Sequence, residues 1–244
     1  KTFTSAADMG PYVSKLILEL PEKVRTEFVD KAGFSVYVER QDAEPREVER
    51  AKEQHTDKHA YPSKGYVPVL SAYASDGEGN PQEQSSYIAL ELPEVRLTKR
   101  IDGALTRGYI RVLDFRITQT KAIPSETPSE APLTGLVFDI DTGDVCPDLN
   151  GWDLTGSGIF DDIDMNYGFF TPDLDAVNTA RAARPSSPLP PIASVPLLVW
   201  LHGAGEGQEP YRTVMGNRVT LLSSPEIQEE LGGAAYILTP SSPT

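Results

Sequence analysis

Apolar residues in the first part of the chain come in short runs that alternate with polar residues. Residues 34–39, for example, read apolar, polar, apolar, which is the period of a strand with one buried face. A cluster of turn-forming residues at 75–81 lies between two such runs and predicts a hairpin. Strand after strand without a helical repeat predicts an antiparallel sandwich. The predicted strands are 15–20, 34–39, 67–73, 86–92, 108–118 and 136–140.

Two kinds of segment interrupt this pattern. Residues 41–58 carry many charges and are expected to form a solvated helix or an irregular insertion. Residues 123–132 and 184–191 are rich in proline and serine and are expected to be exposed loops. The character of the chain changes between these two loops, so we expect a first domain over residues 1–154 and a second over residues 155–244.

The second part has longer apolar runs followed by glycine. Residues 195–201 form a continuous apolar run, which predicts a strand covered on both faces, as in a parallel sheet. Residues 224–231 predict a helix, with Ser224 as its cap, Pro225 at its first position and Gly232 just beyond its end. Residues 234–238 predict the next buried strand. Strand, glycine loop, helix and strand are the opening elements of an α/β sheet.

Charge and cysteine content narrow the classes of partner. The chain has 22 Lys and Arg against 36 Asp and Glu, a formal net charge of −14, which repels phosphate backbones and anionic lipid surfaces. We therefore expect no nucleic-acid partner, and no apolar run approaches the roughly 18 residues of a membrane span. The single cysteine, Cys146, excludes an internal disulfide and the paired thiolates of a zinc ribbon.

The strongest candidate for chemistry is the loop that follows the apolar run, His202-Gly-Ala-Gly-Glu-Gly207. Three alternating glycines let backbone amides turn toward a ligand without obstruction by a Cβ atom, and such amides can stabilise an oxyanion. A plainer interpretation is that the glycines only form a tight turn from strand to helix. The spacing alone leaves both interpretations open.

Several segments carry a resemblance to a known family. Residues 167–172, 197–207, 216–217 and 235–240 resemble the opening of the α/β-hydrolase fold. More closely, they resemble bacterial esterases related to polyhydroxybutyrate depolymerases and feruloyl esterases, in which an immunoglobulin-like domain precedes the hydrolase domain. Residues 10–18, 34–36 and 73–77 resemble the first strands of that domain. The resemblance implies an immunoglobulin-like β-sandwich followed by the first part of an α/β-hydrolase sheet.

The same resemblance implies roles for the glycine loop. In such esterases the loop after the third hydrolase strand supplies an amide of the oxyanion hole, which by position falls on Ala204, with Gly205 second. His202 is expected to brace the loop through its ring nitrogens, and Gly203 and Glu206 to support it. The implied activity is hydrolysis of a carboxylic ester through a serine, on small acyl or aryl esters, carbohydrate-linked ones included.

The nucleophile of that reaction is not in the sequence. No Gly-x-Ser-x-Gly elbow occurs in the 244 residues, so we expect the catalytic triad to lie in a remaining C-terminal half of the hydrolase, in the same or a separate chain. The chain alone is expected to be inactive. It begins with Lys1 rather than Met, and we expect a secreted or cell-envelope protein. The alternative function is a sandwich module that binds carbohydrate or protein and carries an inactive hydrolase segment.

No cofactor and no metal site are predicted. His55 and His59 are four residues apart, as zinc ligands on a helix would be, but a solvated surface is the better interpretation. The aspartates from Asp139 onward have the oxygen density of a calcium loop, but Asn150 stands where an EF-hand has its last glutamate. Turn-forming aspartates are favoured there.

Overall fold

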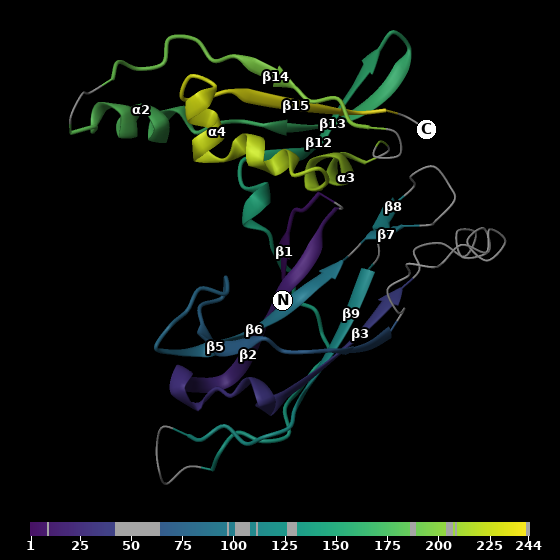
Figure 1. Cartoon of the computed structure of the whole chain (residues 1–244), viewed down its shortest axis with the longest axis vertical. Helices are drawn as coiled ribbons and strands as arrows, with labels where there is room; N and C mark the ends of the chain where they lie inside the picture. The colour runs from purple at the N-terminus through teal and green to yellow at the C-terminus, as the bar shows by residue number, and fades with distance from the viewer. Residues whose placement is uncertain are drawn as a thin grey trace, which may run out of the picture. The chain divides into compact units, whose positions relative to one another are not determined.

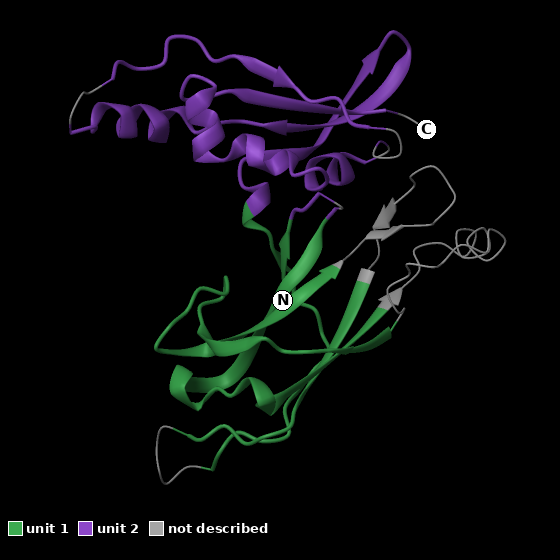
Figure 2. Ribbon diagram, in the orientation of Figure 1, with its two compact units in different colours: residues 1–5, 11–104, 108–147 green, residues 6–10, 105–107, 148–244 purple. Residues whose placement is uncertain are grey.

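The structure is a computed structural model that describes residues 1–8, 10–41, 64–96, 98–100, 108–110, 112–125, 131–185, 189–203, 207 and 209–242. The chain divides into two compact units, which Figure 2 colours green and purple. Unit 1 comprises Lys1–Ser5, Pro11–Ala104 and Gly108–Pro147, and unit 2 comprises Ala6–Gly10, Leu105–Arg107 and Asp148–Thr244. The histidine pair that was considered for zinc, His55 and His59, lies outside the described residues.

Unit 1 is built of two principal sheets (Figure 1). The first has the strand order β11-β1-β2-β6-β5 and the second the order β10-β9-β3-β4, while β7 and β8 form a separate pair. Two 3-10 helices, η1 (Thr26–Phe28) and η2 (Lys31–Gly33), join β2 to β3. The strands are β1 (Thr2–Ser5), β2 (Tyr12–Arg25), β3 (Phe34–Gln41), β4 (Lys64–Val67), β5 (Ser71–Ser75), β6 (Gln84–Arg96), β7 (Thr98–Arg100), β8 (Gly108–Ile110), β9 (Val112–Gln119), β10 (Val137–Phe138) and β11 (Asp144–Val145).

The core of unit 1 lies between these sheets, as the alternation in the sequence predicts. Alternate residues of β2, β3 and β6 point into one cluster, in which Val36 is 1% exposed and Ile88 and Leu90 are fully buried. Strand β2 continues past Pro21, because a shift of register between Glu19 and Val24 relieves the ladder where a proline cannot donate. The predicted sandwich is therefore observed in unit 1.

The predicted hairpin around residues 75–81 joins β5 to β6. Asp76 holds this turn, because its carboxylate accepts hydrogen bonds from the amides of Glu78 and Asn80, both at 2.9 Å. The Asn80 side chain donates to it as well, at 2.9 Å. These hydrogen bonds lower the pKa of Asp76 below its usual value, and the one from the Asn80 side chain has the largest effect.

Two of the predicted strands are wrong as single elements. Residues 67–73 divide into β4 and β5, which belong to different sheets, and the division lies at residues 68–70, which begin with Pro68. Residues 108–118 divide into β8, which pairs with β7, and β9, which pairs with β3. In both cases the apolar pattern is continuous, but the chain passes from one sheet to another within it.

Unit 2 is a four-stranded sheet with the order β12-β13-β15-β14 and helices between its later strands (Figure 1). Strands β12, β13 and β15 are antiparallel neighbours, whereas β14 runs parallel to β15. The elements are η3 (Pro147–Leu149), β12 (Trp152–Phe160), β13 (Ile163–Phe170), α2 (Leu174–Ala182), β14 (Leu197–Val199), α3 (Pro210–Met215), η4 (Val219–Ser223), α4 (Pro225–Glu230) and β15 (Tyr236–Ser241). No helix in the described part of the chain is long and apolar enough to cross a membrane.

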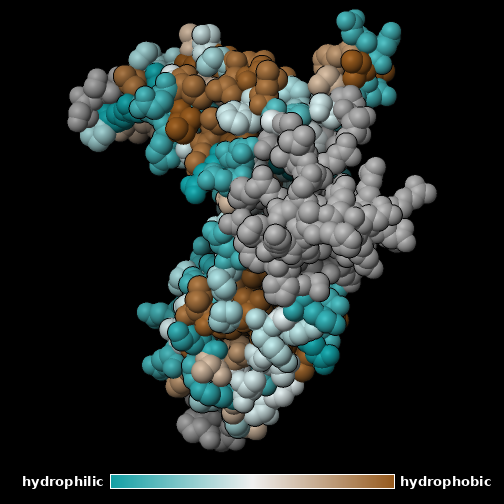
Figure 3. Space-filling view, turned by 45° about the vertical axis from the view of Figure 1, so that its right-hand side comes forward, coloured by the Kyte–Doolittle hydropathy of each residue, from teal (hydrophilic) through white to brown (hydrophobic). Residues whose placement is uncertain are grey.

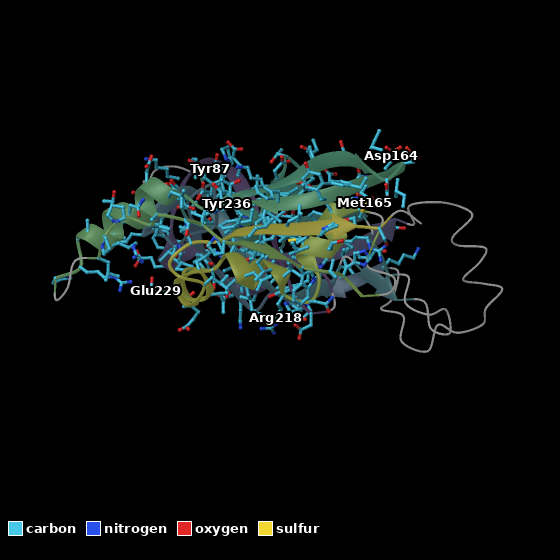
Figure 4. The ribbon with its side chains drawn as sticks, turned by 90° about the horizontal axis from the view of Figure 1, so that it is seen from above. Tyr87, Asp164, Met165, Arg218, Glu229 and Tyr236 are labelled. Atoms are coloured by element: carbon cyan, nitrogen blue, oxygen red, sulfur yellow. The ribbon has the colours of Figure 1, made fainter. Side chains whose placement is uncertain are left out.

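One face of this sheet is buried against the helices. Ile237 and Thr239 of β15 are fully buried, as is Val214 of α3. The prediction for α4 is confirmed: the Ser224 hydroxyl accepts from the Ile227 amide at 3.4 Å, Pro225 follows, and Gly232 has a φ of 101° beyond the end. Figure 4 shows α4 and Glu229 together on one side of β15.

Candidate functional site

The candidate site lies where two parallel strands end. Leu197, Leu198 and Val199 of β14 stand opposite Tyr236, Ile237 and Leu238 of β15. The pairing continues one step further, because the Trp200 amide donates to the Leu238 carbonyl at 2.9 Å. Parallel strands place their carboxyl ends at one edge of the sheet, which is where open α/β sheets bind ligands. The glycine loop and the end of β15 therefore meet at this edge.

His202 joins the two strand ends. Its Nε2 accepts a hydrogen bond from the Ser242 amide at 3.0 Å, and its Nδ1 lies 2.8 Å from the Gly203 carbonyl oxygen. Because an amide N–H can only donate, Nε2 must be the bare nitrogen, so Nδ1 carries the proton and donates to Gly203. A neutral imidazole in this tautomer uses both nitrogens to hold the start of the loop against β15.

Gly207 closes the loop against the same partners. A Cβ atom at this position would overlap Ser242 Oγ and would stand 2.9 Å from His202 Cε1 and 3.0 Å from the Ser242 carbonyl oxygen. A side chain there would force Ser242 and His202 to move. The first and last positions of the loop, His202 and Gly207, are thus both packed on Ser242.

Buried hydroxyl groups support the end of β15 from below. Thr239 Oγ1 donates to the Gly168 carbonyl at 3.1 Å, and the hydroxyls of Thr213 and Ser241 are 3.1 Å apart. Thr213, Thr239 and Ser241 are each no more than 2% exposed. Satisfied hydroxyls at this depth fix the relative positions of β13, β15 and α3, because an unpaired one would be costly. The loop is therefore attached to a well-defined strand end.

The face of the sheet opposite the helices is apolar and exposed. Leu197 and Val199 of the edge strand β14 are 55% and 49% exposed, and Leu201, two residues beyond the strand, is 76% exposed. On this point the prediction of a strand covered on both faces is wrong. Among the described residues no strand pairs with the outer side of β14. Figure 3 shows hydrophobic residues gathered over this part of unit 2.

Trp200 adds a polar feature to the same strand end. Its indole Nε1 is buried and has no hydrogen-bond partner among the described residues. A buried indole N–H normally finds an acceptor, because leaving it unpaired costs free energy.

The predicted site residues fall into two groups. His202 and Gly203 are described and lie at the strand end, whereas Ala204, Gly205 and Glu206 lie outside the described residues. The sequence did not reveal Ser242 as the residue that holds the loop. It is 40 positions from His202, and only the parallel pairing of β14 with β15 brings them together.

Three of the aspartates considered for calcium accept hydrogen bonds from residues of their own unit. Asp144 accepts from the hydroxyls of Thr2 and Thr4 at 2.6 and 2.7 Å, and Asp148 accepts from the Ala6 amide at 2.7 Å. Asp141 accepts from the Gly143 amide at 3.0 Å, as a turn-forming aspartate does. The described residues contain no group of three or more acidic, histidine or cysteine side chains placed to hold a metal ion.

Comparison with known proteins defines the class to which the chain belongs. The family described as the esterase Ig-like N-terminal domain matches residues 1–130, more than half of the chain. The chain belongs to this family, and the resemblance to an esterase with an immunoglobulin-like N-terminal domain is confirmed. No curated protein sequence gave a match.

A solved structure with a similar fold is the "Crystal Structure of a Thermostable Esterase". The TM-score is 0.71 at 18% sequence identity. The similarity covers 99% of this chain but 57% of that esterase. This chain thus spans a little more than half the length of the esterase that it resembles.

Proposed function

We propose that this chain is the N-terminal part of a serine carboxylic ester hydrolase. Unit 2 would be the opening of an α/β-hydrolase sheet, and the loop at 202–207 would supply the oxyanion hole. The observation that carries the proposal is the attachment of both ends of this loop to Ser242, at the carboxyl edge of two parallel strands. Membership of an esterase domain family supports it.

In the proposed reaction a serine oxygen attacks the ester carbonyl carbon while a histidine base removes the hydroxyl proton. The Ala204 amide, with Gly205 second, would donate to the oxygen that becomes negatively charged, and the residue after the serine would give a further amide. The alcohol then leaves with a proton from the histidine, and water hydrolyses the acyl-enzyme. The substrates would be small acyl or aryl esters.

His202 would act as a positioning residue rather than as the triad base. Both of its ring nitrogens are engaged, one by Ser242 and one by Gly203, so neither is available to accept a proton from a nucleophile. Its effect would pass through the loop. Replacing His202 by Ala should therefore lower kcat more than it raises KM, because the displaced amide acts mainly in the transition state.

The serine and its partners would come from a remaining C-terminal half of the hydrolase, as a continuation or a separate chain. The uncovered edge of β14 and the exposed Leu197, Val199 and Leu201 are the surface that such a half would cover. Its next strand would pair with β14, and its helices would pack on the apolar face.

The oxyanion role is tested by Ala204→Pro in a protein that contains both halves. Proline has no amide hydrogen, and loss of one oxyanion donor costs about 3 kcal/mol, or roughly 10²–10³ in kcat. Ala193→Pro, in the exposed loop before β14, is the matched control and should keep the rate. If Ala204→Pro retains its nitrophenyl-ester hydrolysis and its thermal unfolding midpoint, the assignment is wrong.

The partner is tested on the 244-residue chain mixed with the remaining half. The chain alone should show no enzyme-like turnover of nitrophenyl acetate, and activity should appear on mixing. Leu201→Glu should weaken the association, whereas Leu221→Glu, 51% exposed in η4, should not. Turnover by the chain alone, or equal association of both variants, would contradict the proposal.

A further inference from the structure

Unit 1 contains a groove that the proposed esterase chemistry does not use. Its volume is about 620 Å³, within the range of small-molecule sites. In the described part of the chain, β10 pairs with only two residues of β9, Ile117 and Thr118. The groove runs along the part of β9 that precedes this pairing. Strands β2 and β3, Lys1 and Thr2 at the start of the chain, Tyr87 of β6 and the loop that connects β10 to β11 form the other walls.

Three aliphatic residues at the floor of the groove contribute little exposed surface to it. Leu16, Leu18 and Ile117 line it but are only 2%, 4% and 4% exposed, because they belong to the core between the sheets. The more accessible apolar groups are Ile140, which is 80% exposed, and the half-buried rings of Tyr37, Phe115 and Phe138. The groove therefore presents aromatic ring surfaces together with one exposed aliphatic side chain.

Polar side chains are arranged in register beside Tyr37. Tyr37 stands opposite Arg116 on β3 and β9, and Glu39 stands opposite Asp114 one step along the same face. Tyr37 is held by an edge-to-face contact with Tyr66, at 5.3 Å between ring centroids. A ring, a guanidinium and two carboxylates thus lie together on neighbouring strands.

The charges of the lining decide which ligands fit. Five carboxylates line the groove, from Glu19, Glu39, Asp114, Asp139 and Asp141, against the cationic side chains of Lys1 and Arg116. An excess of negative charge in a chain of net charge −14 repels phosphates, fatty acids and acidic sugars. Carboxylates and guanidinium groups are strong partners for hydroxyl groups, and aromatic rings pack on apolar C–H surfaces.

We propose that this groove binds a neutral oligosaccharide. Its hydroxyl groups would donate to Glu39 and Asp114 and accept from Arg116, while a C–H face of a sugar ring would lie against Tyr37. The site is contained in unit 1, and sugar binding there does not depend on ester hydrolysis. An experiment that finds no sugar binding would therefore leave the proposed esterase function unaffected, and the reverse also holds.

The test is calorimetric titration of the 244-residue chain with cellohexaose, xylohexaose and mannohexaose. At least one of these should bind with a Kd below about 1 mM, and hexagalacturonate, which carries a carboxylate on each ring, should not. No binding by any neutral hexasaccharide would overturn the proposal. Binding of hexalysine in their place would also overturn it, and would identify the groove as a site for basic peptides.

Variants locate the binding. Tyr37→Ala and Arg116→Ala should each weaken the affinity for the sugar by about tenfold, an effect of the size expected for one ring contact or one charged hydrogen bond. Arg25→Ala removes an exposed arginine of the same unit outside the groove and should leave it unchanged. Tyr37→Leu keeps an apolar side chain on β3 should Tyr37→Ala fail to fold. Unchanged affinity in both Tyr37→Leu and Arg116→Ala would contradict the site.

Discussion

Space rather than backbone conformation restricts Gly207 to glycine. A methyl group there would overlap Ser242 Oγ and crowd His202. Gly207→Ala should therefore lower the free energy of unfolding of unit 2 by about 1–3 kcal/mol, the usual cost of overpacking, as measured by urea denaturation. Gly65→Ala is the matched control, because a Cβ at Gly65 meets nothing within 4 Å.

A second substitution makes the argument specific. Ser242→Gly removes the hydroxyl that the methyl group would overlap, so the double variant Gly207→Ala with Ser242→Gly should recover part of the lost stability. Strict additivity of the two single effects would mean that Gly207 and Ser242 do not oppose each other, and the described packing of the loop would be incorrect.

Tyr73 makes the stability of unit 1 depend on alkaline pH. Burial, assisted by the Glu91 carboxylate 3.1 Å from its hydroxyl, raises the pKa of Tyr73 from 10.0 to about 12. Between these values the unfolded chain loses the proton and the folded chain keeps it, so the unfolded state binds fewer protons and stability falls as pH rises. The contribution is fully present below pH 10.0 and is lost as pH passes through about 12.

Tyr73→Phe should accordingly flatten the dependence of the unfolding free energy on pH between 10.0 and about 12. Glu91→Gln should flatten it only in part, because burial is the larger cause. Denaturant titrations at a series of pH values measure both. An equal slope in wild type and Tyr73→Phe would show that the phenol does not titrate in this way.

At the scale of elements, the β12–β13 hairpin has an aspartate at a turn position that favours glycine. Asp161 and Asp162 form its two-residue loop with φ values of 52° and 63°, positive at both positions as a type I′ turn requires. Aspartate tolerates this conformation less well than glycine, so Asp162→Gly should stabilise unit 2 by roughly 0.5 kcal/mol.

The neighbouring Asp164→Gly is the matched control for this change. It removes the same charge from the same hairpin, but Asp164 lies within the extended strand β13, where glycine should destabilise by about 0.5–1 kcal/mol. Thermal unfolding of the two variants should shift in opposite directions. Shifts of the same sign would mean that charge, not backbone conformation, governs the hairpin.

The same elements show what the sequence could and could not predict. Strands with clean alternation, such as β3, and the capped helix α4 follow from local chemistry and were predicted. The division of residues 67–73 between two sheets was not, because alternation describes which face of a strand is buried and not which sheet it joins. The exposure of β14 was missed because an apolar run indicates burial without indicating by what.

The candidate site divides in the same way. Its glycine loop was predicted from residue types, since glycines after an apolar strand are a local signal. Its anchor was not, because Ser242 reaches His202 only through the register that pairs Val199 with Leu238. Such long-range pairings depend on the whole sheet, and a single sequence carries no local mark of them.

At the scale of the whole molecule, each of the two units has a buried core of its own. Ile88 lies in the core of unit 1 and Ile237 in that of unit 2, and both are fully buried. Removing three carbons from either side chain should cost about 2–5 kcal/mol, because the cavity left behind is only partly refilled.

We expect the two units to unfold in separate calorimetric transitions, so that Ile88→Ala lowers the midpoint of one transition and Ile237→Ala that of the other. The two substitutions are chemically identical, so each serves as the control for the other. A single transition that both variants lower by the same amount would instead show that the two cores unfold as one cooperative body, and the division of the chain into units would then carry no thermodynamic meaning.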